Sequence, residues 1–539
     1  MQKLAATSLA VLLVVGQFAI PAVSNAQQSG AATATPIKHL VVIFDENISF
    51  DHYFGTYPHA LNPKGEPRFV AVPDTPTVNG YTDALLRRNP NFLNASGNGA
   101  QAVNPFRLDR SQAATADQDH GYTPEQEAFH AGLMDSFPEY TGRRGSPIRS
   151  HANGLVMGYF DGNTVTALWN YAQYYALNDN SFNTNFGPST PGAINLISGQ
   201  TNGVSDEINA GGKVIDGGNG TRTLISDPDP IGDVCSTTTG ALVQFSGQNI
   251  GNLLNHAGIT WGWFEGGFDL SKTDPNGTTG CARSHTSDIT KVRSRDYSPH
   301  HEPFQYYLST ANPKHLRPTS TQMIGHVGDA ANHQYDIDDF YAAVRAGNMP
   351  AVSFLKAPAY QDAHAGNSDP IDEQAFVVHV MDFLQDQPQW SSTAVIIAYD
   401  DSDGWYDHQM GPIVNQSTTP SDMLTGNGQC GAGTDNALAG PKTPHAQGRC
   451  GYGPRLPMLV ISPYARRNFV DHALTDQTSV IRFVEDNWLG GQRIGAGSFD
   501  AIAGPLNGMF NFTQPPRRDV LILNPSSGEV ETSARRNHP

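Results

Sequence analysis

Short apolar runs alternate with longer amphipathic segments through most of this 539-residue chain. Apolar runs bounded by turn-forming residues are typical of buried strands, and an apolar spacing of three to four residues is typical of helices. The predicted strands are Leu40–Phe44, Ile259–Phe264, Ala351–Leu355, Ala394–Tyr399 and Pro457–Ser462. The predicted helices are Val165–Ala176, Gly247–Ala257, Ile337–Ala346, Glu373–Gln385 and Asp476–Trp488. This alternation predicts an α/β fold whose mostly parallel sheet is covered by helices on both faces.

Three long stretches interrupt the alternation, at about residues 57–150, 269–334 and 402–455. They are rich in Gly, Pro, Asn, Asp and His, and loops of this length in a compact protein are usually functional. We found no internal repeat and no low-complexity segment. The pattern therefore predicts a single domain, residues 27–539, that carries these stretches as insertions.

Oxygen-bearing side chains directly follow two of the predicted strands. The first strand is followed by Asp45, Glu46 and Asn47, and the fourth by Asp400 and Asp401. Open α/β sheets bind ligands at the carboxyl ends of their strands, and buried acidic groups are costly unless something binds them. These two strand ends predict one divalent-cation site.

A serine and several loop histidines are further candidates for chemistry. Ser189 precedes an apolar stretch that could form a helix, and a helix N-terminus is a natural anion site. The histidines His120, His300, His301 and His364 lie in loops, whereas His52 is expected to be structural.

Each of these features also has a simpler explanation. Ser189 could serve only as a helix N-cap, and Asp400–Gly404 could be an Asp-rich turn held by Asx hydrogen bonds. A histidine in a loop is often simply exposed to solvent. The functional interpretation requires that these groups converge on one pocket.

Residues Met1 to Ala26 have the features of a secretory signal peptide: Lys3, an apolar run, and a small-residue cleavage site. A transmembrane anchor is the weaker alternative, because polar residues and a proline interrupt the run. We therefore expect an exported protein, periplasmic or extracellular, with no transmembrane anchor in the mature chain.

The cysteines and the net charge add two expectations. Cys235, Cys281, Cys430 and Cys450 are even in number, which fits an oxidising compartment. We favour the pairs Cys235–Cys281 and Cys430–Cys450, although three connectivities remain possible. The formal charge is −18, and no basic patch is present, which argues against nucleic acid as a partner.

Three segments resemble motifs of the bacterial phosphoesterase family. This family contains phospholipases C and acid phosphatases and belongs to the alkaline-phosphatase-like superfamily. Glu46–Gly55 is similar to its opening signature, Gly187–Pro191 to its nucleophile segment, and Tyr399–His408 to its late acidic motif. Gly192–Asn195 looks more like the acid phosphatase branch. Gln477 stands where the phospholipases tend to carry a histidine that could serve a second metal ion.

The resemblance implies a role for each candidate residue. Glu46, Asn47, Asp400 and Asp401 would bind one divalent metal ion, with Ser189 completing the set. The identity of this metal ion (Mg, Ca, Mn, Zn or Fe) is left open. The four loop histidines would line a phosphate pocket, and Asp45 would lie behind the metal ligands.

The expected activity is that of a metal-dependent acid phosphatase acting on phosphate monoesters through a phosphoserine at Ser189. His364 or His301 would protonate the leaving oxygen, which predicts an acidic pH optimum. The alternative enzyme is a phospholipase C acting on phosphodiesters such as phosphatidylcholine, so a phospholipid headgroup is the alternative partner. The alternative from another class is a non-catalytic, secreted, metal-stabilised binding protein.

Overall fold

An eight-stranded sheet forms the centre of the computed structural model, which describes residues 32–142, 154–216, 222–414 and 450–532. Its strands follow the spatial order β14, β11, β15, β1, β16, β17, β4, β18. Their bounds are β1 His39–Asp45, β4 Ala176–Asn178, β11 Trp261–Glu265, β14 Gln334–Asp336, β15 Val352–Lys356, β16 Thr393–Tyr399, β17 Met458–Ile461 and β18 Phe469–Asp471. Only β17 runs antiparallel to its neighbours among these strands, which confirms the mostly parallel sheet.

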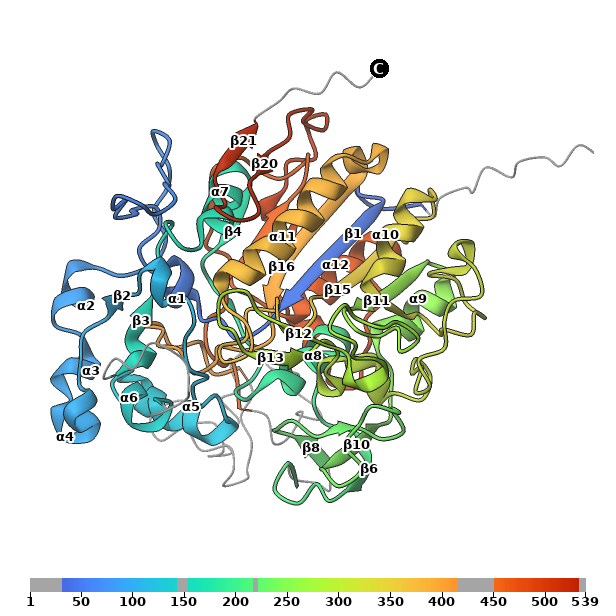
Figure 1. The fold of residues 1–539 in the computed structure, drawn as a ribbon, viewed down its shortest axis with the longest axis horizontal. Helices are drawn as coiled ribbons and strands as arrows, with labels where there is room; N and C mark the ends of the chain where they lie inside the picture. The colour runs from blue at the N-terminus through green and yellow to red at the C-terminus, as the bar shows by residue number, and fades with distance from the viewer. Residues whose placement is uncertain (1–31, 143–153, 217–221, 415–449, 533–539) are drawn as a thin grey trace, which may run out of the picture. The chain divides into compact units, whose positions relative to one another are not determined.

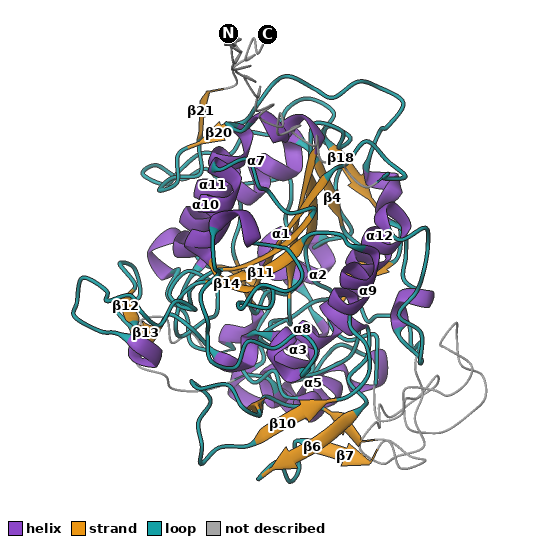
Figure 2. Ribbon diagram, turned by 90° about the vertical axis from the view of Figure 1, so that its right-hand side faces the viewer, coloured by secondary structure: helices purple, strands orange, loops and turns teal. Residues whose placement is uncertain are grey.

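Helices cover both faces of this sheet, as predicted. Figure 2 shows α7, α10 and α11 on one side and α9 and α12 on the other. The bounds are α7 Thr166–Tyr174, α8 Ser189–Ser198, α9 Ile250–Ala257, α10 Ile337–Arg345, α11 Pro370–Gln385 and α12 Thr478–Trp488. All five predicted strands and all five predicted helices are present, with boundaries that differ by a few residues.

One predicted boundary is wrong in an instructive way. The sequence pattern extends a helix from Val165 to Ala176, but α7 ends at Tyr174 and Ala176 begins the three-residue strand β4. β4 pairs with β17 and β18 on its two sides. Ala176 is extended because β4 pairs with strands that lie far along the chain. The local spacing of apolar residues carries no information about that pairing.

The first insertion is partly helical and was predicted only as a loop. It contains α2 Asp83–Arg87, α3 Pro90–Leu93, α4 Ala95–Asn98, α5 Tyr122–Phe129 and α6 Phe137–Tyr140. Smaller strands lie outside the main sheet: β6 Val204–Ile208 and β10 Leu242–Phe245 pair with each other, as do β12 Ser284–Thr286 and β13 Arg293–Arg295. The short helix α1 (Phe50–Phe54) directly follows the first signature.

The cysteine and N-terminal predictions have different outcomes. Cys235 and Cys281 form a disulfide with a Cα–Cα distance of 5.3 Å, as expected. Cys430, the expected partner of Cys450, lies outside the described residues, as does the predicted signal peptide Met1–Ala26. Within the described part of the chain, no helix is both long and apolar enough to span a membrane.

The sheet order explains how distant segments meet. Figure 1 shows β1, in blue, between β16 and β15, although these strands lie more than 300 residues later in the chain. The carboxyl ends of β11, β15, β1 and β16 therefore form one edge of the sheet. This edge carries the candidate site.

Candidate active site

The register of the central strands places the two predicted ligand pairs side by side. Asp45 at the end of β1 lies opposite Tyr399 at the end of β16, so Glu46 and Asp400 come next on adjacent strands. The backbone N–H of Asn47 donates a hydrogen bond of 3.0 Å to Asp400 Oδ1. Asn47 has a φ of 62°, a left-handed conformation that asparagine tolerates better than most residues. The chain therefore turns sharply here and stays within the site.

Ser189 is brought to the same place by α8. It is the first residue of this helix, and its Oγ lies 3.0 Å from Glu46 Oε2 and 3.1 Å from Asp401 Oδ2. The N-cap explanation is wrong, because the cap position is Pro188 and Ser189 makes no capping bond. A hydroxyl held between two carboxylates at a helix N-terminus is suited to act as a nucleophile once its proton can leave.

Gly192 lets the helix approach the strand closely enough for these contacts. A Cβ atom at this position would lie 2.0 Å from the backbone oxygen of Asp400. No other residue type could be accommodated without moving α8 away from the end of β16. The glycine of this motif thus fixes the distance between the hydroxyl and the carboxylates.

Glu46 is the centre of the charged network. Lys356, the last residue of β15, forms a short ion pair with Glu46 Oε1, and His301 Nδ1 lies 3.1 Å from the same oxygen. Burial would raise the pKa of the Glu46 carboxyl, but His301 and Lys356 hold that pKa well below its usual range. These two partners therefore favour the ionised form of Glu46.

The remaining acidic groups are only partly neutralised by His120 and Lys356. Burial, followed by the carboxylates of Glu46 and Asp401, raises the pKa of Asp400 well above its usual range, and the pKa of Asp401 is raised to about 6. Within the described chain, the buried oxygens Asp400 Oδ2, Asp403 Oδ2 and Asn47 Oδ1 accept no hydrogen bond. Such orphaned acceptors fit a bound cation, and an all-oxygen donor set suits a hard divalent ion.

The four predicted histidines lie around this cluster, and none is fully exposed. His301 is buried against Glu46, and its ring lies 4.3 Å from that of His300 between centroids. His120 Nδ1 lies 3.1 Å from Asp403 Oδ1, and the rings of His120 and His364 are 6.1 Å apart. The exposed-loop alternative is therefore wrong for these residues.

Their protonation differs according to their neighbours. Burial lowers the pKa of His364, but the carboxylates of Asp117 and Glu46 more than compensate and raise it to about 9. Burial dominates for His301, whose pKa falls well below its usual range. His364 is thus a cation at neutral pH.

A cavity of about 550 Å³ lies beside the acidic cluster. We call it the histidine cavity because His300, His301 and His364 all line it. His301 connects the two, since it also contacts Glu46. This cavity is the space into which the substituent of a substrate bound at Ser189 could extend.

Three further predictions concern supporting residues. The Asx turn exists, because the Asp403 N–H donates to Asp401 Oδ1 at 2.6 Å, yet the other carboxylate oxygen of Asp401 reaches Ser189. Gln477 Nε2 donates to the backbone oxygens of Tyr399 and Asp400, so it positions the end of β16. His52 is buried and stacks on a tryptophan, as expected for a structural residue.

Sequence reasoning missed Lys356 and Asp403. Lys356 follows an apolar strand in the same way as the predicted ligands do, so the strand-end rule could have found it. Asp403 was assigned only to a turn, although its buried side chain contacts His120 and Asn47. No signal in the sequence indicates which loop residues meet across the site, since that depends on the sheet order.

Comparison with known proteins identifies the family. The model of the Phosphoesterase family matches residues 37–489, so the chain belongs to this family. The resemblance described in the sequence analysis is thereby confirmed, and the protein is a hydrolase that acts on phosphoric ester bonds.

Curated relatives carry the name phospholipase C. The chain is 25% identical over 490 residues to the non-hemolytic phospholipase C of Pseudomonas aeruginosa, which covers 89% of this chain but only 58% of that protein. It is 23% identical to phospholipase C A of Mycobacterium tuberculosis, over 93% of this chain and 82% of that protein. These relatives favour the phospholipase C alternative over the acid phosphatase predicted first.

Solved structures are more distant. A protein of the alkaline phosphatase superfamily from Vibrio parahaemolyticus is 10% identical, with a TM-score of 0.28 over 67% of each chain. Murine ectonucleotide pyrophosphatase/phosphodiesterase 5 is 12% identical, with a TM-score of 0.30 over 64% of this chain and 95% of that one. TM-scores this low support no conclusion about function.

Proposed function

We propose that this protein is a phospholipase C-type phosphodiesterase with Ser189 as its nucleophile. The observation that carries the proposal is the position of Ser189 Oγ, which lies between two carboxylates at the start of α8. The names of the curated relatives support the diester substrate class. A non-catalytic binding protein, the third alternative, is not supported by membership of a family of hydrolases.

The residues present fit one divalent cation, held by Glu46, Asn47, Ser189, Asp400 and Asp401. A bound cation would supply positive charge that lowers the pKa of the Ser189 hydroxyl and neutralises phosphoryl oxygens. The donor groups do not identify the metal. Gln477 is occupied with backbone oxygens at the end of β16, which favours a single cation over two.

Ser189 would attack phosphorus as its proton leaves to a neighbouring base. A new Oγ–P bond forms, and the bond between phosphorus and the ester oxygen breaks. His364, a cation at neutral pH, is suited to give its proton to the departing oxygen. Water would then attack the phosphoserine, release the phosphorylated product and return a proton to Ser189.

The second candidate function is hydrolysis of phosphate monoesters. The similarity of Gly192–Asn195 to the acid phosphatase branch favours it, as does the replacement of a histidine by Gln477. Both reactions use the same nucleophile, and they differ only in whether the phosphoserine carries a second ester substituent.

A direct comparison of diester and monoester hydrolysis tests the proposal. Product release from phosphatidylcholine and from a chromogenic phosphate monoester should be measured for wild type, Ser189→Ala and the control Ser198→Ala, which alters the other end of the same helix. We expect Ser189→Ala to lose at least about a thousandfold in kcat with both substrates, and the control to keep its activity. Full activity of Ser189→Ala would refute the assignment of the nucleophile.

Export to the periplasm or the medium remains part of the proposal. The Cys235–Cys281 disulfide supports it, because such bonds persist in oxidising compartments. Mass spectrometry of the N-terminus of the secreted protein should show cleavage after Ala26. An uncleaved cytosolic protein would contradict export.

A further inference from the structure

The histidine cavity has a second chemical character besides its histidines. Arg293 and Arg295, which lie two residues apart on β13, also line it. Asp229 is the only carboxylate among the described residues that do so. Guanidinium groups keep their charge at every physiological pH. The cavity is therefore cationic, although the whole chain has a formal charge of −18.

These arginines are not used up by internal ion pairs. The guanidinium of Arg295 makes no hydrogen bond or close ion pair with any described residue, although its charge lowers the pKa of Asp229, and that of Arg293 donates only to the hydroxyl of Ser284 at 2.8 Å. Ser294, between them, is 8% exposed and lines the cavity, and its hydroxyl has no hydrogen-bond partner in the described chain. The two available guanidinium groups are the donors that an anionic group requires, whereas the Ser294 side chain points to the opposite face of β13.

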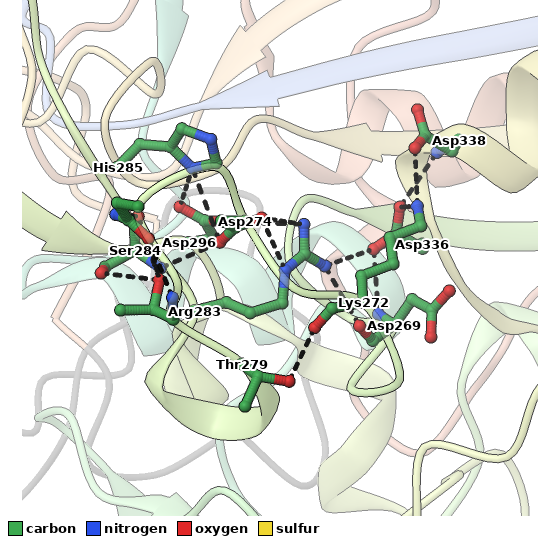
Figure 3. A network of polar contacts seen from close by, with 12 residues as sticks. Asp269, Lys272, Asp274, Thr279, Arg283, Ser284, His285, Asp296, Asp336 and Asp338 are labelled. Atoms are coloured by element: carbon green, nitrogen blue, oxygen red, sulfur yellow. Dashed lines mark hydrogen bonds and ion pairs between the residues drawn. The ribbon is translucent and has the colours of Figure 1, made fainter.

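The hairpin that carries the arginines is held firmly in place. Figure 3 shows Arg283, just before β12, between Asp274 and Asp336, with Nη–Oδ distances of 3.0 and 3.4 Å. His285 on β12 lies 2.7 Å from Asp296, the residue that directly follows Arg295. The Cys235–Cys281 disulfide joins this region to the cavity wall, which includes Cys235. The backbone of the hairpin is thus fixed before a ligand binds, while the side chains of Arg293 and Arg295 remain exposed and available.

We propose that the histidine cavity is a subsite for a second anionic group on the substituent of the phosphate ester. This inference rests on the proposed function, since it assumes that the phosphate itself lies at Ser189. The preferred substrates would be esters that carry a carboxylate or a second phosphate beyond the scissile phosphorus. Arg295 and Arg293, whose side chains lie on the same face of β13, would bind that group.

The lining of the cavity disfavours a choline group. Quaternary ammonium ions are bound by the faces of several aromatic rings. Apart from histidines, Tyr297 is the only aromatic residue among the described lining residues, and its ring packs edge-to-face against Phe268. Two arginines would also repel the positive charge of choline.

Two matched substrate pairs test the subsite, and they show whether its ligand is a lipid headgroup or a small soluble phosphate ester. Phosphatidylserine and phosphatidylethanolamine differ by one carboxylate, as do 3-phosphoglycerate and glycerol 3-phosphate. We expect wild type to prefer the carboxylate-bearing member of at least one pair by about threefold to tenfold in kcat/KM. A preference within the lipid pair identifies a headgroup ligand, and one confined to the soluble pair identifies a small phosphorylated acid.

Variants of the arginines decide whether the cavity causes the preference. Arg295→Gln should abolish most of the carboxylate preference and leave activity on the substrate without the carboxylate unchanged. Arg295→Lys should retain part of the preference. Arg88→Gln, which alters an exposed arginine outside the cavity lining, is the control. Equal activity on both members of each pair, a preference for choline esters, or a preference that survives Arg293→Gln/Arg295→Gln would overturn the inference.

A binding measurement separates this inference from the proposed function. The Ser189→Ala variant should bind 3-phosphoglycerate more tightly than glycerol 3-phosphate by a similar factor in isothermal titration calorimetry. Carboxylate preference in binding, without ester hydrolysis by wild type, would refute the function and uphold the subsite. Ester hydrolysis by wild type without a carboxylate preference in binding would uphold the proposed function and refute the subsite.

Discussion

Two buried acidic clusters come from the same two signature segments and are built differently. In the first, Asp51 and Asp407 are bound by Arg455, with distances of 2.9 and 3.1 Å to their carboxylates. His408 contacts the remaining oxygen of Asp51 at 2.6 Å, and the Gln409 N–H donates to that of Asp407 at 2.8 Å. Every carboxylate oxygen of this cluster has a partner.

The second cluster lies a few residues earlier in each segment and is left open. Glu46 is paired with Lys356, but Asp400 Oδ2 and Asn47 Oδ1 accept no hydrogen bond in the described chain. A cluster in which every carboxylate oxygen has a partner stabilises the folded protein. A cluster with unpartnered oxygens lowers the stability of the ligand-free protein until a ligand binds. The contrast supports our proposal that the near half of each motif takes part in the chemistry, while the far half fixes the loops.

The largest effect should come from opening the closed cluster. Arg455→Met would leave two carboxylates buried without their cation, which should lower the free energy of unfolding by about 3–5 kcal/mol. Urea titration followed by circular dichroism measures this. The control Arg467→Met removes a largely exposed ion pair and should change stability by less than about 1 kcal/mol. Equal effects of the two variants would show that Arg455 does not stabilise the loops.

Removing charge from the open cluster should separate stability from activity. Asp400→Asn eliminates a carboxylate that Glu46 and Asp401 repel, so stability in the presence of a chelator should not fall. Activity should fall roughly a thousandfold, about 4 kcal/mol in activation free energy, because a proposed metal ligand is lost. Asp288→Asn, at a side chain that is 99% exposed, is the control for both measurements. A marked loss of stability without loss of activity would reverse our assignment of the two clusters.

The pH profile tests the role of His364. Its raised pKa means that the imidazolium persists at neutral pH and is lost as pH rises through about 9. Activity that depends on this proton should therefore extend from mild acid to neutral pH and decline on the alkaline side. His364→Gln should lower kcat at pH 7 by about a hundredfold and remove this decline, while His59→Gln at an exposed position should not. An unchanged alkaline limb in His364→Gln would assign the proton to another group.

The smallest expected effect is that of metal removal on stability. Treatment with a chelator should lower the melting temperature by a few degrees and abolish activity, and a divalent cation should restore both. At a hundredfold excess over its Kd, a bound ion stabilises by about 2.7 kcal/mol. The Asp400→Asn variant should not respond. A chelator response equal to that of wild type would place the ion elsewhere.

Much of the fold could be predicted because its strands are buried on both faces. Leu40–Phe44 and Ala394–Tyr399 are continuous apolar runs, and such runs mark central parallel strands. The polar residues that end them stand out for the same reason, and Glu46 and Asp401, from two different strand ends, both lie within 3.1 Å of Ser189 Oγ. β4 and β18 were missed because each has only three residues, and their pairing partners lie far away in the chain.

The surroundings of the site could be predicted only in part. Ser189 was found through the residues that begin its helix, and the histidines through their concentration in loops. The pairing of Glu46 with Lys356 and the lining of the histidine cavity by Arg293 and Arg295 follow from the order of strands in space. That order results from packing of the whole sheet, which no local window of the sequence contains.

The pairing of β1 with β16 also limits when the candidate site can assemble during synthesis. The first strand is translated about 350 residues before the strand that it pairs with, and Arg455 is translated later still. Until the late segment is made, Glu46 has neither Asp400 nor Asp401 beside it, and Ser189 has only part of its surroundings. Contacts of such large sequence separation form slowly. A growing chain therefore lacks part of the proposed site until at least the first 401 of its 539 residues have been synthesised.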